Sequence, residues 1–377
     1  MIYLICFGIS TALIAFPAKG KRVRAILTFL ALMIPSLLAG FRTNSVGTDT
    51  GDYPLSLFEI AKSSGYITYL NSSFEHMWVR DFVYDMGIGY ATFIYIIAMF
   101  FEKYAAVLFF TEFVIVLCVF RAIFISFSHR YRWIAMLLFY FMFYNVTLNN
   151  MRQWMAMAIL LLAFAHFIKK DKSWIVYALL GLTFHKTAVC GLLVFAVYFV
   201  VERIRLRPIK IDTRRYSGKL LMACCIIVLC LIFIMYMGLT RKIMSMIGLS
   251  SFLNYFEGKI IFSKGRFLLE MPMVMLIIVN WKDMKQNPIK YFFLTFVLVN
   301  LICSQINTMN VLAWRISAYI SEFTILVCPY IISLCKKQSK QLIENISVCG
   351  YGVLYWMYYF YVQNLHQTLP YVMAQII

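Results

Sequence analysis

The sequence predicts an all-α, polytopic integral membrane protein with about 12 transmembrane helices, broken or re-entrant half-helices and one larger external loop. Of its 377 residues, 63% are hydrophobic and only 14% are charged, whereas a soluble domain carries about a quarter charged residues. The mean hydropathy is +0.80. The apolar runs are continuous rather than alternating, which favours helices over a transmembrane barrel. No polar stretch is long enough for a soluble domain, so residues 1–377 are expected to form a single transmembrane domain.

The candidate spans are apolar runs separated by short polar connectors. The first run lacks a basic segment before it and is followed by one, which indicates a retained span rather than a cleaved signal peptide. Spans are expected at 2–16, 25–40, 88–101, 105–127, 133–148, 153–168, 174–184, 187–201, 220–239, 267–281, 291–306, 313–334 and 344–362.

Lysine and arginine orient these spans, because short basic connectors stay in the cytoplasm. The basic connectors are 19–24, 169–172, 203–219, 282–290 and 336–340. The other connectors then face the exterior of the cytoplasmic (inner) membrane, including external loops at about 42–87 and 240–266 and the short turns at 149–152, 185 and 307–315. Five polar elements are thus expected on one outward face.

Two features complicate the count of spans. The runs 174–184 and 187–201 are too short to cross separately, and half-helices that meet at His185 reconcile them with their basic flanks. Thirteen crossings also conflict with the expected sides of the connectors, because the 42–84 loop should lie outside and Arg130–Arg132 inside. Either 88–101 or 105–127 is therefore expected to be re-entrant. The outer loop 240–266 carries several basic residues, so either it binds an anion or its assigned orientation is wrong.

Composition also excludes several classes of function. The net charge of +19 lies mainly in the connectors, which argues for topology control and against nucleic-acid binding. The ten cysteines lie almost entirely within apolar runs, without the spacing of metal ligands. The chain also lacks the phosphate-binding loop, the zinc helix and the dinucleotide fingerprint. We therefore expect no metal and no cofactor.

The first candidate motif follows the second span and combines arginine, carboxylates and turn-forming glycines. An arginine fork suits phosphate, and a carboxylate in such a loop can orient a substrate or accept a proton. The alternative is an ordinary turn in which the arginine side chain extends from the membrane interface to place its charged group in water. The residues are Arg42, Gly47, Asp49, Gly51, Asp52 and Tyr53.

The second motif, Asn149-Asn150-Met151-Arg152-Gln153, opens an apolar helix. An arginine at a helix N-terminus opposes the helix dipole. The placement is explained if an anion binds there, since the guanidinium and the first amides of the helix can share it. The alternative is again that the Arg152 side chain extends along the apolar surface to place its charged group in water.

The third motif places His185 and Lys186 between two apolar runs. A lone histidine in such surroundings usually just satisfies a hydrogen bond. Here it accompanies a lysine at an expected helix break, and histidine exchanges protons near neutral pH. His76, His129, His166 and His366 lack this context and are expected to be interfacial.

The fourth motif begins the span at 313–334. Arg315 and Tyr319 are four residues apart, so they share one face of a helix. An interfacial belt of Trp314, Arg315 and Tyr319 explains the pattern almost as well.

Taken in order, the motifs resemble the EpsG-like polysaccharide polymerases, which are related to the Wzy-type polymerases of O antigen and capsule. The resemblance runs from residue 25 to about 335 and rests on Arg42, Gly47, Thr48, Asp49, Tyr53, Asn149, Arg152, Gln153, Ala156, Phe184, His185, Arg315, Tyr319 and Pro329. Members often carry a glutamate before a Gly-aromatic pair near the third span. Here the nearest acid is Asp85, which we do not assign a role.

The resemblance implies an enzyme that moves a glycan from a polyprenyl-pyrophosphate carrier to the sugar of an incoming lipid-linked repeat. Arg152 and Arg315, then Arg42, would neutralise the diphosphate, and His185 would be the base, with Asp49 as rival or orienting partner. The remaining candidates for substrate binding are Asp52, Tyr53, Gln153, Lys186 and Tyr319. The expected partners are the lipid-linked oligosaccharide and the lipid bilayer, and a chain-length regulator fits the same reading.

The sequence leaves two other classes of function open. A flippase or transporter for lipid-linked oligosaccharide would share the apolar composition, but such proteins are often built from repeated halves, and no internal repeat is evident. A membrane acyltransferase acting on glycans would also use an intramembrane histidine. The ordered arginine motifs favour a pyrophosphate donor over a thioester.

Overall fold

The computed structural model describes the chain apart from residues 77–78, 207–245, 247–260, 285–289, 307–310 and 375–377. The described residues are mainly helical, which confirms the expected all-α class. A short antiparallel hairpin, β1 (Ser73–His76) and β2 (Val79–Phe82), is an addition that hydropathy did not predict.

The chain forms two compact units. The first contains Met1–Val189 and Asn345–Ile377, and the second contains Cys190–Glu344. Helix α18 (Gln338–Trp356) runs from the second into the first. The single domain expected over 1–377 stays a prediction.

In the first unit, helix α9 is almost entirely buried and packs against α6 and α10. Helix α2 packs on α6, and α1 packs on α2 and α7. The consecutive pairs α1–α2 and α9–α10 pack together, and so do helices that lie further apart in sequence, such as α2 with α6. The helices of this bundle are α1 (Ile2–Ala15), α2 (Lys21–Gly40), α6 (Ala105–Ser126), α7 (His129–Phe139) with the π-helix η2 (Tyr140–Tyr144) and α8 (Asn145–Thr147), α9 (Met151–Ile168) and α10 (Trp174–Phe184).

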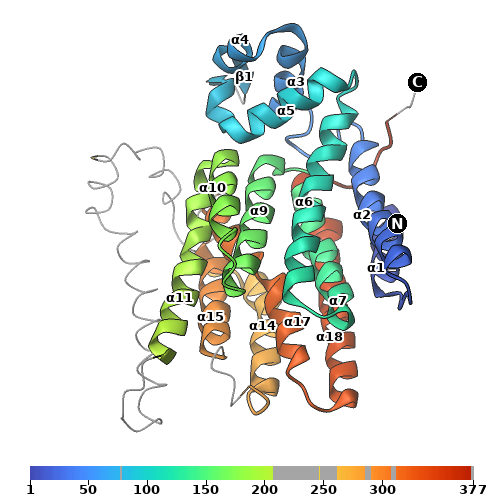
Figure 1. Cartoon of the computed structure of the whole chain (residues 1–377), viewed down its shortest axis with the longest axis vertical. Helices are drawn as coiled ribbons and strands as arrows, with labels where there is room; N and C mark the ends of the chain where they lie inside the picture. Colours follow the sequence, from blue (N-terminus) through green and yellow to red (C-terminus); the bar gives the residue numbers. More distant parts are fainter. Residues whose placement is uncertain (77–78, 207–245, 247–260, 285–289, 307–310, 375–377) are drawn as a thin grey trace. The chain divides into compact units, whose positions relative to one another are not determined.

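The two ends of this bundle differ in charge. The basic connectors 19–24 and 169–172, together with Arg130–Arg132, lie at the end opposite to the cluster formed by α3, α4, β1 and α5 (Figure 1). Arg24 is close enough to His129 and Arg132 to interact with them electrostatically. Since the chain reverses at each connector, the turns after α2, before α9 and after α10 all lie at the other end.

The expected external loop at 42–87 is folded. It contains α3 (Tyr53–Ser63), α4 (Tyr66–Asn71), the hairpin and a 3-10 turn, η1 (Val83–Met86). Helix α5 (Ile88–Phe100) packs against α3. With 13 residues it is about 20 Å long, shorter than the roughly 30 Å hydrocarbon core. Since α6 has 22 residues, the structure favours α5 as the segment that does not cross.

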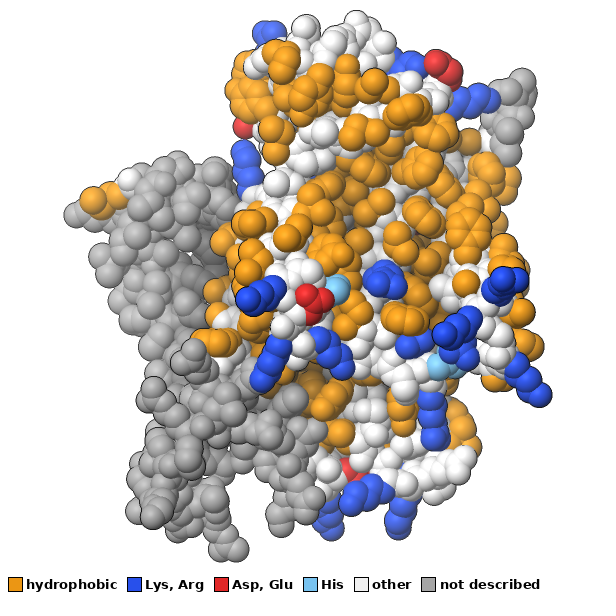
Figure 2. All heavy atoms as spheres, in the orientation of Figure 1, with side chains coloured by type: hydrophobic (Ala, Val, Ile, Leu, Met, Phe, Trp, Pro, Cys, Tyr) orange, Lys and Arg blue, Asp and Glu red, His pale blue; other side chains and the backbone are white. Residues whose placement is uncertain are grey.

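Three of the described helices, α2, α6 and α9, are long and apolar enough to cross a membrane, and the other apolar helices are shorter. The expectation of about 12 spans is therefore not confirmed. Large hydrophobic side chains are nevertheless exposed along several helices, among them Phe29, Phe100 and Leu179. In Figure 2 such side chains cover much of the face on view. A surface this apolar suits contact with lipid rather than water.

The second unit contains α11 (Leu192–Leu206), α14 (Lys264–Asn280), α15 (Lys290–Ile306), α16 (Val311–Ser321) and α17 (Thr324–Ser333). Helix α15 packs against α11, α14 and α16. The span expected at 313–334 is broken between α16 and α17 at Glu322. The span expected at 220–239 and the loop at 240–260, apart from Met246, lie outside the described residues.

Candidate active site

Three of the four sequence motifs meet at one end of the first unit. Hydrogen bonds join the loop after α2 to the turn before α9. The end of α10 meets residues 85–87, and Met86 of that segment contacts Arg152 at the start of α9. The chain segments are far apart in sequence, so this convergence is a product of the bundle.

The 42–50 loop docks on Asn149 at the entry to α9. The Asn149 Oδ1 atom accepts the Asp49 backbone N–H at 2.8 Å. The Thr48 hydroxyl lies 2.9 Å from that oxygen and 3.0 Å from Asp49 Oδ1, so its one proton serves either acceptor. Gly47 has φ +96°, and a Cβ there would approach Thr50 Oγ1 to 2.9 Å. The glycine therefore permits the turn that presents Asp49.

Arg42 is held by backbone carbonyls. Its side chain is buried, Nη2 donates to Leu148 O at 2.8 Å and Nη1 donates to Ala39 O at 3.2 Å. These bonds tie the end of α2 to the turn before α9. The guanidinium is thus engaged by the protein itself, and the expected role of Arg42 as a phosphate ligand stays a prediction that this geometry does not favour.

Arg152 is held differently, although it too lies at a helix end. It occupies the first turn of α9, is partly exposed, and its guanidinium lies over the Tyr53 ring with Cζ 5.4 Å from the centroid. Its Nη1 is 3.1 Å from Met86 Sδ. Among the described residues Arg152 has no carboxylate partner within ion-pair distance. A cation that opposes the helix dipole and lacks an acid is suited to an external anion.

Lys186 lies beside the same segment. Its Nζ is 3.5 Å from Asp85 Oδ1, and both side chains are exposed to solvent. Asp85 and Met86 belong to η1, so this turn contacts both cations. At the next residue, Gly87 (φ +90°), a Cβ would meet Phe184 O at 2.6 Å, which shows how closely η1 approaches the end of α10. We call Tyr53, Asp85, Met86, Arg152 and Lys186 the α9 rim.

His185 lies at the expected helix break. Helix α10 ends at Phe184, His185 is extended (φ −151°, ψ 134°), and a 3-10 helix, η3 (Lys186–Gly191), follows. The break predicted from the two short apolar runs is confirmed. His185 is buried; the Thr187 backbone N–H donates to its Nδ1 at 3.3 Å, and Thr187 Oγ1 is 2.6 Å from the same atom. An Nδ1 that accepts places the proton of neutral imidazole on Nε2.

The other expected residues are less central. Asp52 precedes α3, and its carbonyl accepts Ser56 N–H at 3.3 Å. Gln153 is buried in the first turn of α9. Arg315 and Tyr319 belong to α16 of the second unit, so their part in this site stays a prediction.

One residue that the sequence analysis overlooked is Glu112 on α6. It is buried, and its Oε2 accepts the Thr147 hydroxyl at 2.8 Å. Arg42 is near enough to act on it electrostatically. A single acid within a 22-residue apolar helix was a readable signal, because an ionisable group inside a membrane segment is a candidate for function by default.

His366 is a second residue whose contacts the sequence analysis overlooked, and its expected interfacial position stays a prediction. Its Nδ1 lies 3.0 Å from Asn149 Nδ2, because the C-terminal segment folds back against the 42–50 loop. Nothing in the local sequence around His366 indicates this contact.

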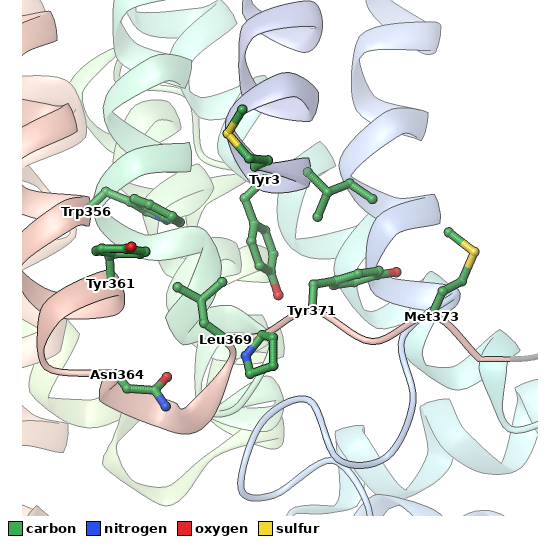
Figure 3. A pocket seen from close by; sticks show the side chains of 10 residues that line it. Tyr3, Trp356, Tyr361, Asn364, Leu369, Tyr371 and Met373 are labelled. Carbon is green, nitrogen blue, oxygen red and sulfur yellow. The ribbon is translucent and has the colours of Figure 1, made fainter.

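A cavity of about 680 Å³ lies against the same C-terminal segment. Its walls include the aromatic rings of Tyr3, Trp356, Tyr361 and Tyr371 (Figure 3). The Tyr3 hydroxyl donates to Thr368 O at 3.0 Å and the Tyr371 hydroxyl to Leu38 O at 2.8 Å. These bonds hold two of the rings in place at the edge of the helix bundle.

Within the described part of the chain, no three His, Cys, Asp or Glu side chains come together as a metal site would require. Helices with lipid-suited surfaces and a polar site at their ends define a helical membrane protein. The chain belongs to the EpsG family, whose model matches residues 25–373. It is therefore a membrane protein related to the polysaccharide polymerases, as the resemblance implied. Searches of curated proteins and of solved structures returned no match.

Proposed function

We propose that this protein is a bacterial surface polysaccharide polymerase. It transfers a growing glycan from its polyprenyl-diphosphate carrier to a sugar hydroxyl of an incoming lipid-linked repeat unit. Family membership supports the coarse class of glycosyltransferase-like polymerase. The observation that carries the finer proposal is Arg152, a partly exposed guanidinium at the start of α9 that has no acid partner among the described residues.

A polyprenyl diphosphate supplies an anionic partner for Arg152, which has no acid partner among the described residues. As the bond between the anomeric carbon and the diphosphate oxygen breaks, charge accumulates on that oxygen. Arg152 is placed to hydrogen-bond it, with the first amides of α9 nearby. Lys186 adds a second cation, which is more exposed and lies 3.5 Å from Asp85. The Tyr53 ring beneath Arg152 restricts the guanidinium and so reduces the entropy lost on binding.

The reaction requires one proton acceptor. The acceptor hydroxyl forms the new bond to the anomeric carbon, its proton leaves to a base, and the diphosphate departs on the lipid carrier with the electron pair of the broken bond. The geometry favours Asp49 over His185 as the base. The backbone of Asp49 is anchored on Asn149, and a carboxylate accepts protons without a change of tautomer.

His185 suits a donor role instead. Because Thr187 N–H points at Nδ1, the ring carries its proton on Nε2, and that N–H can hydrogen-bond a sugar or phosphate oxygen. His185→Gln retains a side-chain N–H donor but no basic ring nitrogen. Retained elongation in this variant would support the donor role, and abolished elongation would return His185 to the role of base.

The site is proposed to face the exterior of the cytoplasmic membrane. The basic connectors lie at the opposite end of the first unit, and positive connectors stay in the cytoplasm. Lipid-linked repeats would reach the site from the outer leaflet, with the prenyl tail against the exposed apolar helix faces.

Elongation in detergent micelles tests the proposal. The purified protein, given lipid-linked repeat units alone, is expected to produce a ladder of longer glycans without nucleotide or metal. A flippase would give no ladder, because micelles have no second compartment, and an acyltransferase would require an acyl donor and add an acyl mass. Unchanged single repeats with well-folded protein would refute the proposed polymerase.

A further inference from the structure

The C-terminal strap, residues 363–374, follows the π-helix η5 (Met357–Val362) and returns to the loop that carries Asp49. Thr43 N–H donates to Val372 O at 3.0 Å, and Ala374 N–H donates to Phe41 O at 2.7 Å. Gly47 N–H donates to Gln367 O at 3.1 Å. The strap and the loop therefore share backbone hydrogen bonds across more than 300 residues of sequence.

Side chains anchor the strap on the helix bundle next to His366. The Thr368 side chain is buried, and its Oγ1 accepts from Asn145 Nδ2 at 2.8 Å. Asn145 Oδ1 in turn accepts the Trp356 indole N–H at 2.8 Å. These bonds fix the residue two positions after His366 and so restrict where its ring can lie.

The amide of Asn149 connects His366 to the loop. Since Asn149 Oδ1 accepts the Asp49 N–H, its Nδ2 faces His366 Nδ1 at 3.0 Å and must donate. That direction requires an unprotonated Nδ1. Burial lowers the pKa of His366 to about 4, so the imidazole is neutral at physiological pH, as the bond requires.

The backbone at this point is unusual. His366 has φ +68°, and Asn364 and Gln367 also have positive φ. Left-handed conformations in residues other than glycine are uncommon and are retained where the surroundings over-determine them. The strap therefore holds the imidazole in a strained position that places Nδ1 opposite Asn149.

We propose that His366 is a positioning residue that acts through Asn149 to hold Asp49 and Thr48 in place. The inference rests on the proposed function in so far as Asp49 acts on substrate. The strap, more than 300 residues from this loop in sequence, is then needed to hold the loop in place. His366 acts through Asn149 and is not proposed to contact the reacting atoms.

A matched pair of variants tests this proposal. His366→Asn keeps an acceptor oxygen near the place of Nδ1 and tolerates positive φ, whereas His366→Gly tolerates positive φ but has no acceptor. We expect His366→Asn to elongate at close to the wild-type rate. His366→Gly should lose about tenfold in kcat with KM little changed, as for a lost neutral hydrogen bond. Gln363→Ala, at an exposed strap position, is the control and should match wild type.

Hydrogen–deuterium exchange gives a readout that does not depend on activity. Exchange in peptides covering residues 45–50 should rise in His366→Gly and stay low in His366→Asn and Gln363→Ala. Equal exchange and equal kcat in the two His366 variants would overturn the inference. If wild type fails to elongate glycans but the exchange difference persists, the proposed function fails and the positioning role stands.

A second variant applies if His366→Gly does not reach the membrane. Asn149→Asp still accepts the Asp49 N–H but has no N–H for His366. We expect faster exchange across residues 363–374 and a loss of kcat similar to that of His366→Gly. Unchanged exchange across the strap in Asn149→Asp would contradict the proposed link.

Discussion

Two polar clusters, one in each unit, contain similar side chains but differ in whether each charged group has a charged partner. At the junction of α14 and α18 in the second unit, Lys340 Nζ lies 2.7 Å from Asp283 Oδ2 and donates to Val279 O at 3.1 Å. Glu344 accepts from Asn280 Nδ2 at 2.7 Å and from Cys335 Sγ at 2.9 Å. Each charged side chain here has partners within the chain. In the α9 rim, Arg152 contacts a ring and a thioether instead of an acid.

The difference separates a structural cluster from a binding site. A charge taken from water is costly unless it is paired, and the α14–α18 junction meets that requirement internally. In the α9 rim, Arg152 is partly exposed and has no acid partner among the described residues, so an incoming anion can pair with it. Arg42 repeats the contrast within the first unit, because backbone carbonyls engage its guanidinium.

The largest expected effect follows from Arg152→Lys. The change keeps the charge but removes the planar fork, and we expect elongation to fall by about 100- to 1,000-fold, as on loss of one donor to a developing oxyanion. Elongation of lipid-linked repeats by purified protein measures this. Arg132→Lys is a matched control, since Arg132 also stacks on a ring (Phe124, 3.8 Å) but lies among the basic connectors. Equal losses of elongation in the two variants would show that the α9 rim is no more important for the reaction than the end of the unit with the basic connectors.

Arg42→Met tests whether the buried Arg42 stabilises the fold rather than binding substrate. It leaves the carbonyls of Leu148 and Ala39 without their donor, and we expect a loss of about 2–3 kcal/mol in stability. A thermal unfolding scan in detergent would show a clear drop in Tm, together with lower membrane levels. Normal Tm with lost elongation would instead make Arg42 a ligand of the diphosphate, as the sequence first suggested.

Lys340→Met addresses the cluster in the second unit. The lysine is about three-quarters buried and links Asp283 to the end of α14. We expect a stability loss of about 1 kcal/mol, since partly exposed pairs contribute little, and an unchanged elongation rate per folded molecule. A large fall in kcat with unchanged Tm would show that this cluster also serves the reaction.

Tyr53→Leu and Tyr53→Phe give the smallest expected effect. The leucine variant removes the ring under Arg152, and we expect elongation to fall about three- to fivefold, in keeping with a partly exposed cation–π contact. The phenylalanine variant keeps the ring and should lose less than the leucine variant. If the two variants behave alike, the ring does not orient Arg152.

Local hydrophobicity determined many of the described helices, although not α3 and α4 of the external loop. The runs read at 2–16, 105–127 and 174–184 became helices at Ile2–Ala15, Ala105–Ser126 and Trp174–Phe184. In lipid a chain must satisfy its own backbone, so a long apolar run is a helix whatever its neighbours are. The break at His185 followed from the same reasoning, because two short runs with basic flanks cannot both cross. The acid at Glu112 was equally visible, although we did not use it.

Tertiary structure alone decided which polar residues are available for chemistry. Arg42 and Arg152 look alike in sequence, yet the carbonyl that holds Arg42 lies 106 residues away, whereas Arg152 meets Tyr53 and Met86. His366 reaches Asn149 across 217 residues, and no local pattern encodes that distance. Hydropathy is a property of neighbouring residues, but a side chain's partner depends on which helix ends the bundle brings together.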